Sequence, residues 1–142
     1  MRAEAEGWAE LSELLARLSP EQMVEPGFSE DWNVKDLLAH IGGWLGDAAQ
    51  DLDRIRQGTY QVTEWTDVQT DAANLEMYKS LRDTDLQTVR RELLAARQAL
   101  LDAFGRLPDV TGDAEDVFRT EGPEHYADHL VDLRRFVDSG VG

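Results

Sequence analysis

The chain has 142 residues, and its 29 acidic and 14 basic side chains give a formal net charge of −15. This excess of negative charge argues against nucleic acid or an anionic membrane as a partner, because both require clustered Lys and Arg. The absence of cysteine excludes disulfides, a thiol nucleophile and cysteine-ligated metals. An apolar fraction of 42% is enough for one core, so we expect a single domain over residues 1–142.

The N-terminal segment has none of the features of a targeting sequence. It carries four glutamates in its first 13 residues, without the basic start or the unbroken apolar run of a signal peptide. No apolar stretch is long enough to span a membrane. We therefore expect a cytoplasmic protein.

The first half of the chain predicts two long amphipathic helices, because apolar residues recur at steps of three and four. The first covers residues 3–18. Residues 19–31 contain two prolines and predict a loop that could include a short turn. Asn33 is a good N-cap for the second helix, and Asp36, three residues later, completes a capping box. Gly58 provides the C-terminal stop of this helix.

The second half predicts two more long helices. One covers residues 85–107 and ends at Pro108. Residues 108–122 contain Gly and Asp and predict a loop. The last helix is expected to begin at Pro123, because a proline in the first helical turn loses no hydrogen bond.

A shorter helix is predicted between these halves, from Thr66-Asp67 to Leu81, with Leu75 and Tyr78 facing inward. Four long helices and one short connector indicate an all-α protein, a four-helix bundle. The long connection over residues 58–84 would let the chain cross the bundle.

The three histidines are the strongest candidates for a site. His125 and His129 are four residues apart, which places both imidazoles on one helix face, and His40 lies on the second predicted helix. All three fall at the border between core and solvent. Three imidazoles with one open position are typical of catalytic zinc, and nickel or iron would accept the same ligands. In the first turn of the last helix, His125 would be kept neutral by the helix dipole.

The same pattern has ordinary explanations. A histidine pair at this spacing occurs by chance, and a hydrogen-bonded histidine at the edge of a core is common. Several aspartates could support the metal ligands or attract the cation, and the sequence does not choose among Asp36, Asp47, Asp51, Asp128 and Asp132.

Four blocks of sequence carry a family resemblance. They read LSPEQMVEPG at residues 18–27, DWNVKDLLAHI at 31–41, WTDVQTDAAN at 65–74 and TEGPEHYADH at 120–129. With these blocks the chain resembles the DinB-like superfamily of metal-binding four-helix bundles. The pattern is most similar to the ClbS/DfsB branch, and mycothiol-dependent maleylpyruvate isomerase-type N-terminal domains are relatives.

The resemblance implies a divalent metal on His40, His125 and His129, with zinc expected first and nickel or iron as alternatives. It implies a homodimer, and a low-molecular-weight thiol as a cofactor in some members. The family includes thiol-dependent transferases and isomerases, a hydrolase of a reactive cyclopropane, and ClbS-like members that could act without a metal.

Three further residues are weak candidates for binding a cofactor or substrate. Trp44 lies one turn beyond His40 and could wall a pocket, although a packed core aromatic is the simpler interpretation. Asn74 matches a recurrent asparagine of the family, and a side-chain hydrogen bond that fixes helix packing is an equal alternative to substrate contact. Tyr126 could donate to an oxyanion, although its position in the apolar stripe places it first in the core. Arg90, Arg91 and Arg97 could meet an anionic substrate, or could be ordinary surface ion-pair partners.

Three functions from different classes follow. The first is a metal-dependent detoxification enzyme, a hydrolase or thiol transferase that acts on a small, uncharged or anionic electrophile. The second is a protein that sequesters a small molecule or metal without turnover. The third is a structural bundle with a vestigial triad. Metal content and turnover with and without added thiol would separate them.

Overall fold

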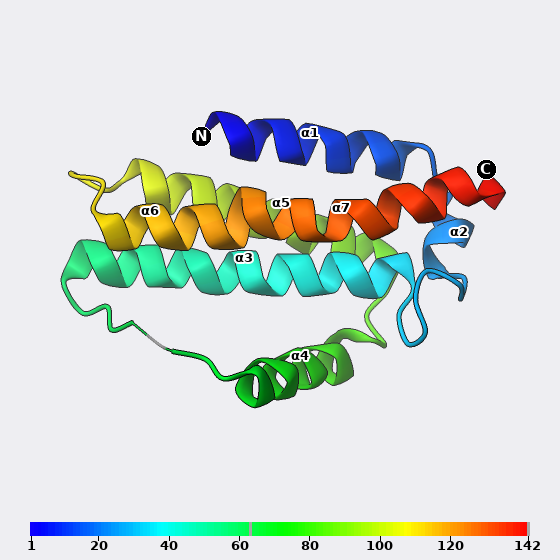
Figure 1. Ribbon diagram of the computed structural model, residues 1–142, viewed down its shortest axis with the longest axis horizontal. Helices are drawn as coiled ribbons and strands as arrows, with labels where there is room; N and C mark the ends of the chain where they lie inside the picture. Colours follow the sequence, from blue (N-terminus) through cyan, green and yellow to red (C-terminus); the bar gives the residue numbers. More distant parts are fainter. Residues whose placement is uncertain (63, 142) are drawn as a thin grey trace.

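Four long helical segments lie side by side in the computed structural model, which describes all residues except Thr63 and Gly142 (Figure 1). These segments are α1 (Arg2–Ala16), α3 (Val34–Gln57), α5 (Leu86–Gly105), and α6 (Gly112–Arg119) continued by α7 (His125–Phe136). The described residues form no strand. The all-α fold class and the helical bundle predicted from the sequence are therefore confirmed.

The start and end of α3 follow from local chemistry. The Asn33 side chain accepts a hydrogen bond from the backbone N–H of Asp36 at 2.8 Å, and the Asp36 carboxylate accepts one from the Asn33 N–H at 3.1 Å. At the other end, Gly58 adopts a left-handed conformation with φ of 77°, which favours glycine over other residues. The capping box and the stop therefore lie where the sequence predicts them.

The helix in the last quarter of the chain differs from the prediction. Residues 112–141 form one uninterrupted helical segment, in which the π-helical turn η1 (Thr120–Glu124) joins α6 to α7 and the turn η2 (Val137–Val141) follows α7. The predicted loop is present only over residues 108–111, and the predictions of a loop over residues 112–122 and of a helix start at Pro123 are wrong. Pro123 lies inside the π-helical turn, where the backbone pattern is already irregular and the missing N–H is tolerated.

The connector helix α4 (Asp67–Leu81) lies across the outside of α3, apart from the other helices (Figure 1). None of its described residues is buried, and Leu75 is 52% exposed, so the prediction that Leu75 faces inward is wrong. Tyr78 stacks on Trp32 at 6.4 Å between ring centroids. A Cβ atom at Gly43 would lie 2.4 Å from the sulfur of Met77, so this glycine allows α4 to approach α3 closely.

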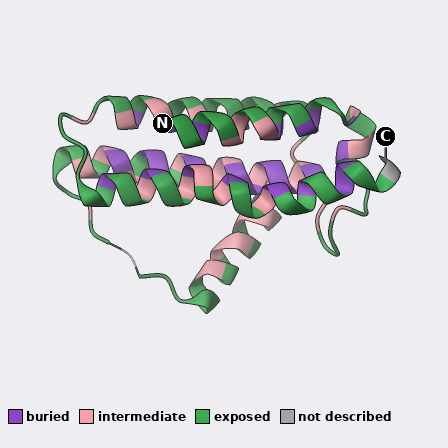
Figure 2. Ribbon diagram, turned by 45° about the horizontal axis from the view of Figure 1, so that its top comes forward, coloured by how far each residue is buried: buried purple, intermediate pink, exposed green. Residues whose placement is uncertain are grey.

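The buried side chains form one apolar core between α1, α3, α5 and α7, as the purple segments of Figure 2 show. Helix α3 contributes the largest share, eight buried apolar residues. The short helix α2 (Pro20–Val24) closes one end of the bundle through Met23. Among the described residues, no helix is long and apolar enough to cross a membrane.

Candidate metal centre

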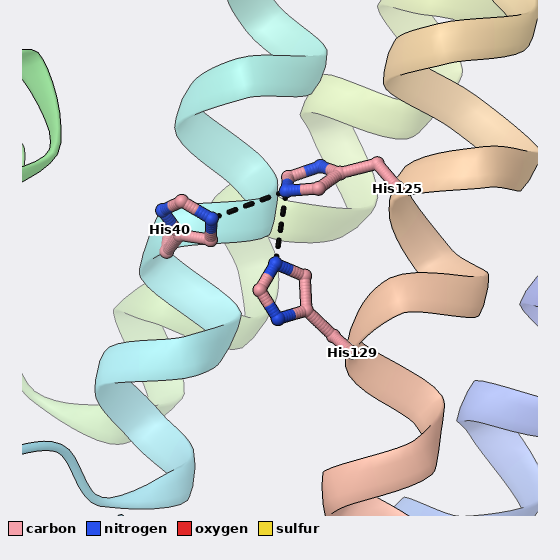
Figure 3. A group of neighbouring side chains, drawn as sticks. All are labelled: His40, His125 and His129. Carbon is pink, nitrogen blue, oxygen red and sulfur yellow. Dashed lines mark hydrogen bonds between the residues drawn. The ribbon is translucent and has the colours of Figure 1, made fainter. Parts of the chain in front are cut away.

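The structure brings the three histidines together on two neighbouring helices. His40 projects from α3, and His125 and His129 project from successive turns of α7 (Figure 3). The Nε2 atom of His125 lies 3.1 Å from Nε2 of His40 and 3.0 Å from Nε2 of His129. Ligand atoms of all three lie within 4.8 Å of one another, which is close enough to hold one metal ion.

Hydrogen bonds alone do not explain this convergence. A neutral imidazole nitrogen carries either one proton or one in-plane lone pair, so Nε2 of His125 cannot form a full hydrogen bond with both neighbours. Nitrogen atoms bound at about 2.1 Å to one ion would be about 3.0 to 3.4 Å apart at angles between octahedral and tetrahedral values. The two separations that involve His125 lie at the lower end of this range, so the three histidines fit as ligands of one divalent ion.

The environment keeps the three rings neutral. Burial, and then repulsion from His125 and His129, lowers the pKa of His40 to about 3. Burial and His129 lower the pKa of His125 to about 4. Burial also lowers the pKa of His129, although Asp128 and Asp132 act in the opposite direction. Neutral imidazole is the form that binds metal.

The physical cause of this neutrality differs from the one predicted. His125 was expected in the first turn of a helix, where the dipole would disfavour its protonation. It lies instead within the continuous helical segment of residues 112–141, more than two turns from the first residue. Burial and the neighbouring imidazoles account for its low pKa.

None of the five candidate aspartates hydrogen-bonds to an imidazole. The Nδ1 atoms of His40 and His125 are buried and have no hydrogen-bond partner among the described residues. Asp36 caps α3, and Asp132 lies 3.5 Å from Arg135. The other three aspartates line a cleft beside the histidines; they are Asp47, Asp51 and Asp128.

This cleft, of about 640 Å³, is bordered by α3, α4, α6, the turn η1 and α7, and all three histidines reach it. Its volume lies within the range typical of small-molecule sites. Trp44 and Asn74 both line it. The indole N–H of Trp44 donates to the side-chain oxygen of Asn74 at 2.8 Å, so this pair also fixes α4 against α3.

Tyr126 does not line the cleft. Its hydroxyl donates to the carboxylate of Glu4 at 2.9 Å, and its side chain is 1% exposed in the core between α1 and α7. Arg97 binds the same carboxylate through two nitrogens, at 2.8 and 2.9 Å, and lies over the ring of Trp8. The structure therefore gives Tyr126 and Arg97 a role in packing, and neither is placed to meet a ligand in the cleft.

Sequence reasoning missed part of the cleft. Glu121, Asp116 and Trp65 line it, and none of them was singled out as a candidate. Burial, and then repulsion from Asp47 and Asp51, raises the pKa of Glu121 to about 7. Glu121 precedes His125 by four residues, so helical spacing would have placed it on the histidine face if the helix had been extended through Pro123.

Comparisons with known proteins agree with the fold. Residues 5–137 match the family described as mycothiol maleylpyruvate isomerase N-terminal domain. A crystal structure of an uncharacterised protein from Escherichia coli UTI89 has a TM-score of 0.77 to this chain and 15% sequence identity, and the alignment covers 96% of this chain and 89% of that one. No curated protein matches the chain. At this identity the structural likeness shows the fold alone, whereas the family match covers most of the sequence. The chain therefore belongs to the mycothiol maleylpyruvate isomerase N-terminal domain family, whose fold is the DinB-like helical bundle.

Proposed function

We propose that the protein is a metal-dependent enzyme of small-molecule detoxification, a thiol transferase or hydrolase that acts on a reactive electrophile. The observation that carries this proposal is the convergence of the Nε2 atoms of His40, His125 and His129, with separations of 3.0 and 3.1 Å along two of the three edges. The family match adds a relationship to mycothiol-dependent enzymes.

In this proposal the three histidines bind the metal ion, and Trp44 and Asn74 shape the cleft beside it. Three neutral imidazoles would hold a divalent ion, with zinc expected and nickel or iron as alternatives, and would leave at least one coordination position open. When bound, such an ion lowers the pKa of a water or thiol at the open position. Trp44, fixed by its hydrogen bond to Asn74, forms a wall of the cleft in which the electrophile would lie.

Metal content tests the first part of the proposal. We expect about one divalent ion per chain in protein purified without chelators, measured by inductively coupled plasma mass spectrometry. His129→Ala should lose most of it, because two imidazoles hold the ion far less well than three. Arg135→Ala is the matched control on α7, since this side chain is 76% exposed. Full occupancy in a His40→Ala/His129→Ala double variant would exclude the triad as the metal site.

Turnover tests the second part. Monochlorobimane with mycothiol reports thiol transfer, and loss of the electrophile without thiol reports hydrolysis. We expect activity in the metal-loaded protein and its loss in His40→Ala, with circular dichroism verifying that the variant is folded. If folded His40→Ala retained wild-type turnover, the metal would not be required and a metal-independent ClbS-like reaction would replace this proposal. Metal binding without turnover of any electrophile would favour sequestration.

A further inference from the structure

The cleft beside the histidines has an acidic end. Five carboxylates line the cleft. Asp128 precedes His129 on α7, and we call the other four the acidic end: Asp47 and Asp51 on α3, Asp116 on α6 and Glu121 in the turn η1. Among the described residues, no lysine or arginine lines the cleft. The negative potential of these side chains is therefore not balanced from within the cleft.

Two of the four carboxylates have a cationic partner outside the cleft. Asp51 lies 2.7 Å from Arg54, and Asp116 lies 3.0 Å from Arg119. Both arginine side chains are about half exposed, at 49% and 51%, so water screens their charge. These ion pairs therefore offset the charge of Asp51 and Asp116 only in part.

The other two carboxylates have no such partner. Neither Asp47 nor Glu121 makes a hydrogen bond or an ion pair with another described residue, although Arg54 acts on Asp47 from a greater distance. Their pKa values are raised by burial and by the neighbouring carboxylates. A positive charge placed between them would relieve this repulsion.

Aromatic rings border the same space. Trp44 and Trp65 both line the cleft, with ring centroids 5.8 Å apart and planes at 82° to each other. Two tryptophan rings at a right angle can contact one ligand from two sides. The faces of tryptophan attract cations, and aromatic cages of this kind recognise alkylammonium groups.

The acidic end and the histidines are separated along the cleft. Asp47 follows His40 by seven residues on α3, a rise of about 10 Å, and Asp51 follows it by eleven, a rise of about 16 Å. Glu121 precedes His125 by four residues, a rise of about 6 Å. One ligand could therefore reach both ends of the cleft with two different groups.

We propose that the cleft binds an organic cation, with a protonated amine or guanidinium at the acidic end and the reacting group toward the histidines. The orientation of the ligand rests on the proposed function, whereas the preference for positive charge does not. The acidic end would repel an anionic substrate, so this proposal replaces the sequence-based expectation of an uncharged or anionic electrophile.

Three probes with the same carbon skeleton test the charge preference: 4-phenylbutylamine, 4-phenylbutanol and 4-phenylbutyrate. Isothermal titration calorimetry of chelator-treated and zinc-loaded protein should give at least about tenfold tighter binding of the amine than of the alcohol, equivalent to about 1.4 kcal/mol. On the chelator-treated protein the butyrate should bind most weakly. D47N/E121Q should lose the preference, and E13Q/D83N, which removes the same charge from exposed positions outside the cleft, should keep it.

The outcomes separate this inference from the proposed function. Equal binding of amine and alcohol by folded protein, or a preference that D47N/E121Q leaves unchanged, would overturn the inference. A second equivalent of zinc that D47N/E121Q loses would overturn it in favour of a second metal site. A preference for the amine in a protein that holds no metal would support the charge preference and would refute only the proposed function and the orientation derived from it.

Discussion

Replacing Glu121 by glutamine should stabilise the protein, and the gain should depend on pH. Burial and two neighbouring aspartates raise the pKa of this carboxyl from 4.5 to about 7 in the folded state. The folded protein therefore retains, between these pH values, a proton that the unfolded chain releases. The protonated Glu121 carboxyl therefore contributes to the free energy of unfolding. This contribution is fully present below pH 4.5 and is lost as the pH rises through about 7.

The magnitude follows from the pKa difference. At about 1.4 kcal/mol for each pKa unit, the stabilisation lost by pH 8 is at most about 3 kcal/mol, and partial exposure of the side chain reduces it to about 1 to 2 kcal/mol. Glu121→Gln does not titrate at this position. Its stability relative to wild type should therefore rise by this amount between pH 5 and pH 8, and its melting temperature at pH 8 by a few degrees.

Thermal unfolding of chelator-treated protein, followed by circular dichroism at pH 5, 6, 7 and 8, measures this effect. Glu124→Gln is the matched control, because it removes the same charge three residues away, where the carboxylate lies 2.6 Å from exposed Arg119. We expect the control to give no gain at pH 8. A Glu121→Gln variant that is less stable than wild type at pH 8, or equally stabilised at pH 5 and pH 8, would refute this account of the acidic end.

Three other predictions concern the metal, the core and assembly. Chelator-treated protein should keep its helical circular dichroism signal, because the apolar core is large enough to fold without an ion. It should unfold at a lower temperature than the metal-bound protein, because a ligand that binds the folded state stabilises it. Loss of the helical signal would contradict this prediction. Tyr126→Phe should lower the free energy of unfolding by about 1 to 2 kcal/mol in urea denaturation, because the Glu4 carboxylate loses one of its buried donors. A homodimer remains a prediction, and added salt should favour it by screening the net charge of −15; sedimentation that shows only monomer at low and high salt would exclude it.

The sequence predicted those elements whose signals are local. The cap at Asn33, the helix start at Thr66-Asp67, the stop at Gly58 and the apolar spacing of α1, α3 and α5 need only neighbouring residues, and all lie where expected. Exposure was harder to predict, since Leu75 belongs to α4, which buries none of its described residues. Contacts between residues distant in sequence could not be predicted either. Nothing in the sequence near Arg97 indicates that this side chain binds Glu4, which lies 93 residues earlier.

The prediction at Pro123 had the largest consequence for the site. Proline usually ends or begins a helix, so local reasoning placed a loop before it and left Asp116 and Glu121 out of the site. A π-helical turn accommodates the proline and keeps residues 112–141 in one helical segment. This continuity brings Asp116 and Glu121 to the cleft opposite Asp47 and Asp51 of α3. The histidines indicate what chemistry the cleft can support, whereas the charge of the ligand it favours depends on carboxylates that only the continuous helix brings together.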